Sequence, residues 1–587
     1  MKEFFKQVAA VVVGMISVMF LMGLMFFILL GAIVAAGSSQ PELQKGSVLH
    51  LKLEGEIVER AEENPFDAFL SNTSAASQGL NEILTAIKVA ATDKNVSGIY
   101  IEGGAVSADF ASLQEIRRAL TEFKKSGKFI MAYGDVYTQG AYYVASAADS
   151  VLVNPSGMID WHGIASQPIF YKDLLEKIGV KMQVFRVGTY KSAIEPFILT
   201  EMSPANRAQV SSFVSDIWTS VCADVSASRK LSVDSLNAFA DHYITLNDAS
   251  VYVQKHLADR LTYMDEVRDR LRARAGVGKL NLVTPRELAK CKPAETGHDG
   301  QVAVYYAAGN IVDAESNGGL GGSAEIVGPK VVADLDKLMN DDNVKAVVLR
   351  INSGGGSAYA SEQIWRAVTQ LKRKKPVVVS MGGMAASGGY YMSCAANRII
   401  AEPTTLTGSI GIFGMIPDAS GLLTEKLGLH FDVVKTNESS DFGTVSRPFN
   451  ANESRAMQAH VERGYALFLK RVAEGRGMKV SAVDSIAQGR VWTGRQALGI
   501  KLVDKLGTLD DAIAEAAALA KVKDYSITTS PAATDWMQKL MSESKDGYME
   551  SRLRAALGEY YLPLSFVRGL HRTERIQARI PFEPNLY

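Results

Sequence analysis

The chain contains one long internal repeat, with matching segments about 248 residues apart. The matched segments are Asn95-Val96 with Asn343-Val344, Gly140 to Tyr143 with Gly388 to Tyr391, Pro155 with Pro403, and Arg207 with Arg455. Solenoid repeats are only about 20 to 50 residues long. Each copy is therefore the size of a domain, and we expect two related domains with a site between them.

The repeat divides the chain into four predicted parts. These are an N-terminal anchor at 1–44, a first repeat at 45–290, a second repeat at 300–525 and a C-terminal tail at 526–587. The polar segment between the repeats contains proline and glycine, which is typical of a linker. At 587 residues the chain is long enough for each repeat to bury a large core. The pattern of the tail predicts no role.

Short apolar runs alternate with helical patterns in both repeats. The runs that predict buried parallel strands are 98–101, 129–133, 151–153, 346–351, 377–381 and 398–401. Apolar residues at helical spacing follow, as in Leu113 to Phe123 and Ile364 to Leu371. Ser203-Pro204 predicts the start of a further helix, with the serine as its N-cap. Because strands and helices alternate, the sequence predicts an α/β fold.

Charge and cysteine content argue against several classes of protein. The chain has 63 basic and 63 acidic residues and no long run of one sign, so we expect no nucleic-acid partner. Cys222, Cys291 and Cys394 are far apart and lack metal-ligand spacing, so neither a disulfide framework nor a metal site is predicted. The glycine run 318–322 lacks the GxGxxG pattern and is interpreted as a loop. No cofactor is predicted.

The N-terminus predicts a single membrane span. No charged residue occurs from Gln7 to Pro41, which exceeds the roughly 20 apolar residues that cross a bilayer. A cleaved signal peptide is the alternative, but its apolar core is only about 7 to 15 residues long. Lys2 and Lys6 precede the span and are expected to stay in the cytoplasm. In a bacterium, the rest of the chain then lies on the periplasmic side of the inner membrane.

Ser409 is a candidate nucleophile. It lies in TLTGSIGIFG, where the small flanking residues leave the hydroxyl sterically open. An ordinary Gly/Ser turn is the alternative interpretation. The equivalent position in the first repeat is Asp160, so the serine belongs to one repeat only.

Lys191 is a candidate base for that serine. His162, His430 and His460 lack a setting that suggests catalysis, and lysine replaces histidine in Ser-Lys enzymes. The segment VGTYKSAIEPF surrounds Lys191 mostly with apolar residues, and burial lowers a lysine pKa. The alternative is a surface ion pair with Glu195 at helical spacing.

The NSGGGS segment predicts an oxyanion site. It follows a predicted strand and precedes a predicted helix, so the amides of Gly355 and Gly356 are candidate donors to an oxyanion. Glycine-rich turns of this kind also bind phosphate. The SxxK segment 542–545 lacks the companion motifs of penicillin-recognising enzymes and is not assigned a function.

Four motifs together resemble the signal peptide peptidase A family in its long, double-repeat form. They are TLTGSIGIFG, GTYKSAIEPF, NSGGGSAYASEQI and GGMAASGGYYMSCAA. The resemblance implies that Ser409 is the nucleophile and Lys191 the general base, on a Clp/crotonase-like fold in each repeat. It also implies a membrane-anchored homotetramer that degrades remnant signal peptides. The family usually has proline where this chain has Gly354, directly before the two candidate oxyanion glycines.

Three other interpretations remain open at this point. Ser387 in GMAASGG resembles the nucleophile turn of Clp proteases, but Clp chemistry needs a histidine, and the next one is His430. We therefore interpret Ser387 as a packed turn residue. An acyl-CoA enzyme on the same fold and a membrane scaffold without catalysis are the other two hypotheses.

Overall fold

The computed structural model describes residues 6, 13–15, 17–25, 43–61, 77–292, 297–315, 324–531 and 576–579. In this part of the chain, no helix has the length and apolar content needed to cross a bilayer. Most of the predicted span 7–41 lies outside the described residues, as do the glycine run 318–322 and the SxxK segment 542–545.

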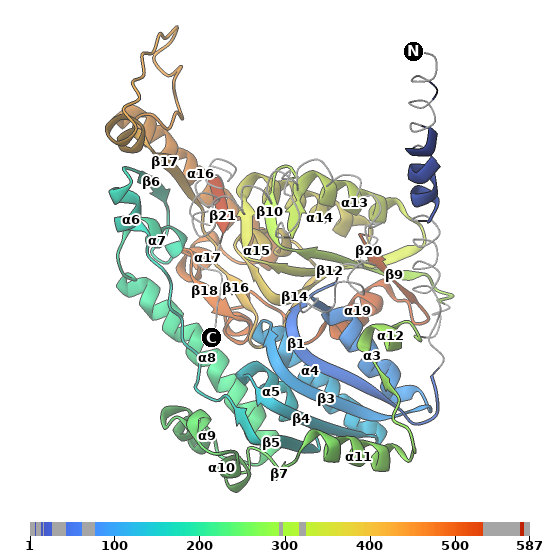
Figure 1. Ribbon diagram of the computed structural model, residues 1–587. Coiled ribbons are helices and arrows are strands. Elements are labelled where there is room, and N and C mark those ends of the chain that lie inside the picture. Colours follow the sequence, from blue (N-terminus) through green and yellow to red (C-terminus); the bar gives the residue numbers. More distant parts are fainter. Residues whose placement is uncertain are drawn as a thin grey trace.

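The first half forms a parallel sheet with helices packed against it (Figure 1). The strand order is β2-β1-β3-β4-β5-β7, with β8 beside β1. The strands are β1 (Ser47–Val58), β2 (Gln78–Gly79), β3 (Val96–Ser107), β4 (Phe129–Tyr137), β5 (Ser150–Ile159), β7 (Arg260–Leu261) and β8 (Leu282–Val283). The strands predicted in this half fall within β3, β4 and β5, so these predictions are confirmed.

The second half forms a larger sheet of similar design. The strand order is β18-β16-β14-β12-β9-β20, with β15 between β14 and β19. The strands are β9 (Gln301–Ala308), β12 (Val344–Ser353), β14 (Val377–Ala386), β15 (Arg398–Ala401), β16 (Leu406–Gly408), β18 (Val491–Thr493), β19 (Lys505–Leu506) and β20 (Ser526–Ser530). All pairs are parallel except β16 with β18. The strands predicted in this half are confirmed too.

A third sheet draws its strands from distant parts of the chain. Its order is β11-β10-β13-β21-β17-β6. The strands are β6 (Lys181–Arg186), β10 (Asn310–Val312), β11 (Glu325–Val327), β13 (Gly355–Ser357), β17 (Phe413–Asp418) and β21 (Ile576–Arg579). Strand β6 belongs to the first half and pairs antiparallel with β17 of the second. This pairing carries the chain that follows β6 into the second half.

Helices pack against the sheets in both halves. Those of the first half are α3 (Leu80–Thr92), α4 (Phe110–Phe123), α5 (Gln139–Ala145), α6 (Lys172–Lys177), α7 (Glu195–Ile198), α8 (Pro204–Arg229), α9 (Val233–Asp241), α10 (Ala249–Gln254), α11 (Met264–Ala275) and α12 (Pro285–Ala289). Those of the second half are α13 (Gly328–Asn340), α14 (Ala358–Lys374), α15 (Gly388–Ser393), α16 (Ala451–Arg476), α17 (Val480–Ile486), α18 (Gly494–Gly499) and α19 (Leu509–Ala520).

Helix α8 confirms the predicted capping signal. The side chain of Ser203 accepts a hydrogen bond from the backbone of Asn206, and Pro204 stands at the first helical position. Proline is favoured there because its missing N–H has no partner in the first turn. The predicted apolar faces of α4 and α14 are buried in the cores of their own halves. The α/β class is therefore confirmed, whereas the four domain boundaries stay predictions.

A buried ion pair joins the two halves. The Arg350 guanidinium on β12 lies 2.8 Å from a Glu59 carboxylate oxygen and 2.7 Å from one of Glu115 on α4. Because both carboxylates face it away from water, the pKa of Arg350 is held well above its usual value. An arginine paired on both sides in this way makes the relative position of the halves specific.

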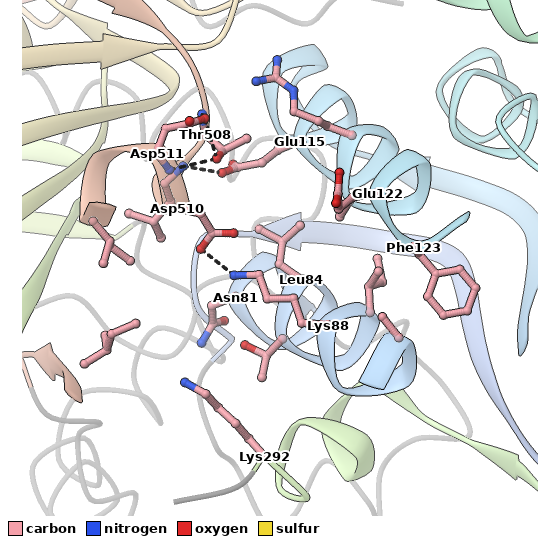
Figure 2. A pocket seen from close by; sticks show the side chains of 18 of the residues that line it. Asn81, Leu84, Lys88, Glu115, Glu122, Phe123, Lys292, Thr508, Asp510 and Asp511 are labelled. Atoms are coloured by element: carbon pink, nitrogen blue, oxygen red, sulfur yellow. Dashed lines mark hydrogen bonds and ion pairs between the residues drawn. The ribbon is translucent and has the colours of Figure 1, made fainter. Parts of the chain in front are cut away.

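A cavity of about 620 Å³ also lies between the halves, lined by residues of α3, α4, α19, β9 and β20. Figure 2 shows Lys88 of α3 reaching Asp510 of α19 across this space, with Glu115 near the start of α19. Lys191, Ser387 and Ser409 are not among its lining residues. The cavity is therefore separate from the candidate active site.

Candidate active site

Lys191 comes from the first half but lies inside the second. It follows β6, whose pairing with β17 brings the chain across. The backbone N–H of Tyr190 then donates to the carbonyl of Gln488 at 2.8 Å, which fixes the segment against the second half. The lysine side chain is fully buried.

Two glycines of the second half make room for the lysine. A Cβ atom at Gly489 would lie 2.6 Å from the Lys191 Cβ, and one at Gly411 would lie 3.2 Å from its Cδ. Gly489 also has a φ of +80°, which favours glycine. Sequence analysis missed the role of Gly489, because QGR carries no motif. Gly411 lies in the TGSIG motif, but its packing role has no local signature.

The buried lysine amine lies among three oxygen atoms. Its Nζ is 2.8 Å from the Oγ of Ser387, 3.1 Å from the Oγ of Ser409 and 3.0 Å from the Ser409 carbonyl oxygen. Both serines are fully buried. The predicted pair of Lys191 and Ser409 is thus within hydrogen-bond distance in a single chain, and Ser387 joins it.

Among the residues that the structure describes, no carboxylate forms an ion pair with the amine. Burial alone holds the pKa of Lys191 well below its usual value. Glu195, the proposed partner of the surface ion pair, instead accepts hydrogen bonds from the Ser203 hydroxyl at 2.6 Å and the Asn206 amide at 2.9 Å. The cation that pairs with Glu195 among the described residues is Arg186, at 4.0 Å. The ion-pair interpretation of Lys191 is therefore wrong.

The three contacts can also be made by a neutral amine, the form that the lowered pKa of Lys191 favours. Such an amine has two N–H donors and one lone pair. The Ser409 carbonyl must accept one N–H, so one serine hydroxyl accepts the other and the second hydroxyl donates to the lone pair. A neutral Lys191 in this arrangement is a base poised to remove a proton from a serine.

Ser387 occupies a strained turn between β14 and α15. Its φ of +54° and ψ of −110° are rare for a residue with a side chain. The turn is fixed by a hydrogen bond from the Ser387 N–H to the Gly408 carbonyl at 2.8 Å. Our interpretation of Ser387 as a packed turn residue was incomplete, because its hydroxyl contacts the lysine directly.

Ser409 lies at the end of β16, beside that turn. Its φ is +47°, and its N–H donates to the Arg490 carbonyl at 2.7 Å. The hydroxyl and the carbonyl of the same residue both contact the lysine. Ser409 therefore orients the amine from two sides, whatever other role it has.

The candidate oxyanion glycines lie close to the Ser387 turn. Gly355 and Gly356 begin β13 with φ values of +100° and +155°. A Cβ atom at Gly355 would lie 2.7 Å from the backbone nitrogen of Gly388. The N–H of Gly355 donates to the Ser353 hydroxyl at 3.1 Å. The oxyanion role of both glycines stays a prediction, and Gly388 is a further amide that sequence analysis did not identify.

The candidate histidines lie elsewhere. His162 pairs with Asp160 at 2.7 Å in the first half, while His430 and His460 are exposed. In the part of the chain that the structure describes, no group of three or more His, Cys, Asp or Glu side chains is arranged to hold a metal ion.

Comparisons with known proteins match the sequence to two family models and to several relatives. The sequence model of Peptidase family S49 matches residues 122–278 and 369–523, and the Clp protease model matches 323–405. "Protease 4" of Salmonella typhi is 37% identical, over 89% of this chain and 87% of that protein. "Protease 4" of Haemophilus influenzae is 35% identical, over 81% and 79%. "Serine protease SPPA, chloroplastic" of Arabidopsis thaliana is 31% identical, over 82% and 70%.

Proposed function

The chain belongs to peptidase family S49 and is a serine peptidase, and we propose that Lys191 is its general base and Ser387 its nucleophile. Membership in a peptidase family sets aside the acyl-CoA enzyme and the scaffold without catalysis. The observation that carries the proposal is the 2.8 Å contact between the buried lysine amine and the Ser387 hydroxyl.

Three observations favour Ser387 over Ser409, to which sequence analysis gave the role of nucleophile. A strained turn from a strand into a helix is the setting that exposes the nucleophile of many hydrolases. The next amide, of Gly388, is the first of α15 and has no partner within that helix. The segment matched by the Clp protease model contains Ser387 and ends before Ser409.

Ser409 then acts through the lysine. With its hydroxyl and carbonyl accepting both N–H groups, the amine lone pair points to the remaining neighbour, Ser387. In this assignment Ser409 positions the base and does not form a bond to the substrate.

The reaction follows from these positions. Lys191 takes the proton of the Ser387 hydroxyl as its oxygen attacks the carbonyl carbon of a peptide bond. The Gly388 N–H, next to Gly355, stabilises the negative oxygen that forms. The protonated lysine gives its proton to the leaving amine, and the C–N bond breaks. Water, activated by the neutral lysine, then hydrolyses the acyl-enzyme and frees Ser387.

We further propose the substrate and the cellular place that the resemblance implies. The substrates are remnant signal peptides, cut by a homotetramer held on the periplasmic side of a bacterial inner membrane by residues 7–41. The uncharged N-terminal run supports the anchor. Carbonate extraction of membranes tests it, because an integral protein stays with the lipid. Release of the full-length chain into the supernatant would contradict the anchor.

Hydrolysis of a fluorogenic hydrophobic peptide tests the catalytic proposal. Lys191→Met and Ser387→Ala are expected to abolish activity, whereas Ser409→Ala keeps a measurable rate. A fluorophosphonate probe, which labels activated serines, is expected to modify Ser387 in the wild type. Labelling of Ser409, or full activity in Lys191→Met, would overturn the assignment.

A further inference from the structure

A short strand from the C-terminal tail lies beside the candidate active site. Strand β21 stands between β13 and β17 and pairs antiparallel with both. Gln577 is opposite Ser357 on one side and Phe413 on the other. More than 150 residues of sequence separate β21 from these neighbours. Figure 1 shows this red strand far from β20, where the preceding described segment ends.

Ala578, the third residue of this strand, presents its carbonyl to the Ser387 turn. A Cβ atom at Gly355 would lie 2.0 Å from the Ala578 carbonyl oxygen and 2.7 Å from the Gly388 nitrogen. A Cβ atom at Gly388 would lie 3.1 Å from the same oxygen. The Ala578 carbonyl therefore lies against the amide that follows Ser387, where the mechanism requires the carbonyl under attack.

The side chains around this contact are closely packed. Ala578 is fully buried, and Gln577 is nearly so. The glycines at 355, 356 and 388 let the two backbones approach, because a side chain at any of them would overlap β21 or its neighbours. Recognition of this kind uses the main chain of an extended peptide, and the burial of Ala578 selects a small residue at that position.

We infer that β13 and β17 form the two walls of a peptide-binding groove, and that residues 576–579 of this chain occupy it as a substrate-like strand. The assignment of the groove to substrate binding rests on the proposed function, since a peptidase binds an extended substrate across its nucleophile. The ligand class is an extended peptide with a small residue at the position of Ala578. The tail then competes with peptide substrates for the same main-chain partners.

Competition by a tethered strand has a measurable consequence. A segment held in the same chain acts at a high local concentration. When only a fraction of the molecules have an open groove, the apparent affinity for an added peptide falls by that fraction. Displacing the strand is therefore expected to lower KM about tenfold, with little change in kcat.

Gln577→Pro in the full chain tests the inference, with Gln577→Ala as its matched control. Proline removes the N–H of a strand that is paired on both sides, so it disfavours occupancy of the groove. Alanine removes the same side chain but keeps the N–H. We expect KM for a fluorogenic peptide to fall in Gln577→Pro and to stay near the wild-type value in Gln577→Ala. A synthetic peptide of residues 574–580, ERIQARI, is expected to inhibit Gln577→Pro competitively.

A binding measurement separates this inference from the proposed mechanism. In a Ser387→Ala background, which lacks the nucleophile, fluorescein-labelled ERIQARI is expected to bind Gln577→Pro more tightly than Gln577→Ala. If Gln577→Pro binds ERIQARI more tightly, but no variant that keeps Ser387 hydrolyses the fluorogenic peptide, the groove is upheld and the catalytic proposal is overturned. Hydrolysis with equal KM in both variants would uphold catalysis and overturn the inference. A third result is that Gln577→Pro loses both thermal stability and activity while ERIQARI fails to inhibit Gln577→Ala. That result would mean that β21 is a structural strand, and it would overturn the inference.

Discussion

The two halves contain the same strand-to-helix turn, but only the second half strains it. In the first half β4 leads into α5 through Thr138, which has an ordinary φ of −62° and ψ of 158°. In the second half β14 leads into α15 through Ser387, with a φ of +54° and ψ of −110°. Gln139 holds the sequence position equivalent to Ser387, and its amide donates to the Gly163 carbonyl at 2.9 Å.

The turn supports the local structure in the first half, whereas in the second half it places a hydroxyl beside the lysine amine. Gln139 fastens a neighbouring loop, whereas Ser387 presents a hydroxyl to a buried amine. Strained backbone costs about 1 to 3 kcal/mol and persists where the surroundings enforce it, often at functional sites. The first half has thus kept the fold of the turn without the strain, and contributes Lys191 instead.

The largest expected effect separates the two turns directly. Ser387→Ala is expected to lower kcat about 10⁴-fold or more, because no other group forms the acyl-enzyme. Gln139→Ala is expected to leave kcat unchanged, since that side chain only supports a loop of the first half. Steady-state hydrolysis of a fluorogenic peptide measures both, and thermal melting checks that each variant folds. Equal losses in the two variants would contradict the comparison.

The second comparison concerns Ser409 and Asp160, which hold equivalent positions. Ser409→Ala is expected to lower kcat about 10 to 100-fold with KM unchanged, because a lost hydrogen bond of about 1 to 3 kcal/mol loosens the lysine. Asp160→Ala is expected to have no effect on kcat, since its partner is His162. If Ser409→Ala instead matched Ser387→Ala and lost fluorophosphonate labelling, Ser409 would be the nucleophile.

The pH profile sharpens the same comparison. In the proposed mechanism the neutral amine is the active form, so kcat/KM is expected to rise with pH as Lys191 loses its proton. Because burial holds the pKa of Lys191 well below 10.5, the rise is expected to end well before that pH.

Ser409→Asp places a carboxylate at the position where the first half has Asp160. It is expected to move the rise about 1 to 3 pH units upward, since a nearby negative charge favours the protonated amine. An unmoved profile would mean that another group titrates.

The smallest expected effect is on stability. Ser387→Gly is expected to raise the melting temperature, because glycine adopts positive φ without strain and about 1 kcal/mol is recovered. Gln139→Gly is expected to lower the melting temperature, because glycine in a relaxed helix costs about 0.5 to 1 kcal/mol. Differential scanning calorimetry compares the two midpoints. A shift in the same direction for both would show that the turns do not differ in strain.

Local sequence patterns predicted the secondary structure well. Apolar runs located β3, β4, β12 and β14, and the Ser203-Pro204 pair located the start of α8. These predictions succeed because strand and helix periodicity depend on neighbours in the sequence. The apolar setting of Lys191 likewise anticipated its burial and its lowered pKa.

The rest of the site depends on contacts between distant segments. Ser387 was set aside for lack of a histidine, because nothing near it in the sequence indicates a lysine that is 196 residues away. The pairing of β6 with β17, which brings that lysine in, leaves no mark on either segment alone. Strand β21 pairs with its neighbours through its backbone, so its sequence IQAR contains no side-chain pattern that predicts the pairing.

In the proposed mechanism, the crossing of β6 into the second half also means that the catalytic pair is incomplete until the second half has been made. The first half leaves the ribosome carrying a base but no nucleophile, and domains fold in the order in which they are made. The proton acceptor meets its serine only after the later strands β14 and β17 have formed. A nascent or prematurely terminated chain that lacks the second half therefore carries Lys191 without the serine that it contacts.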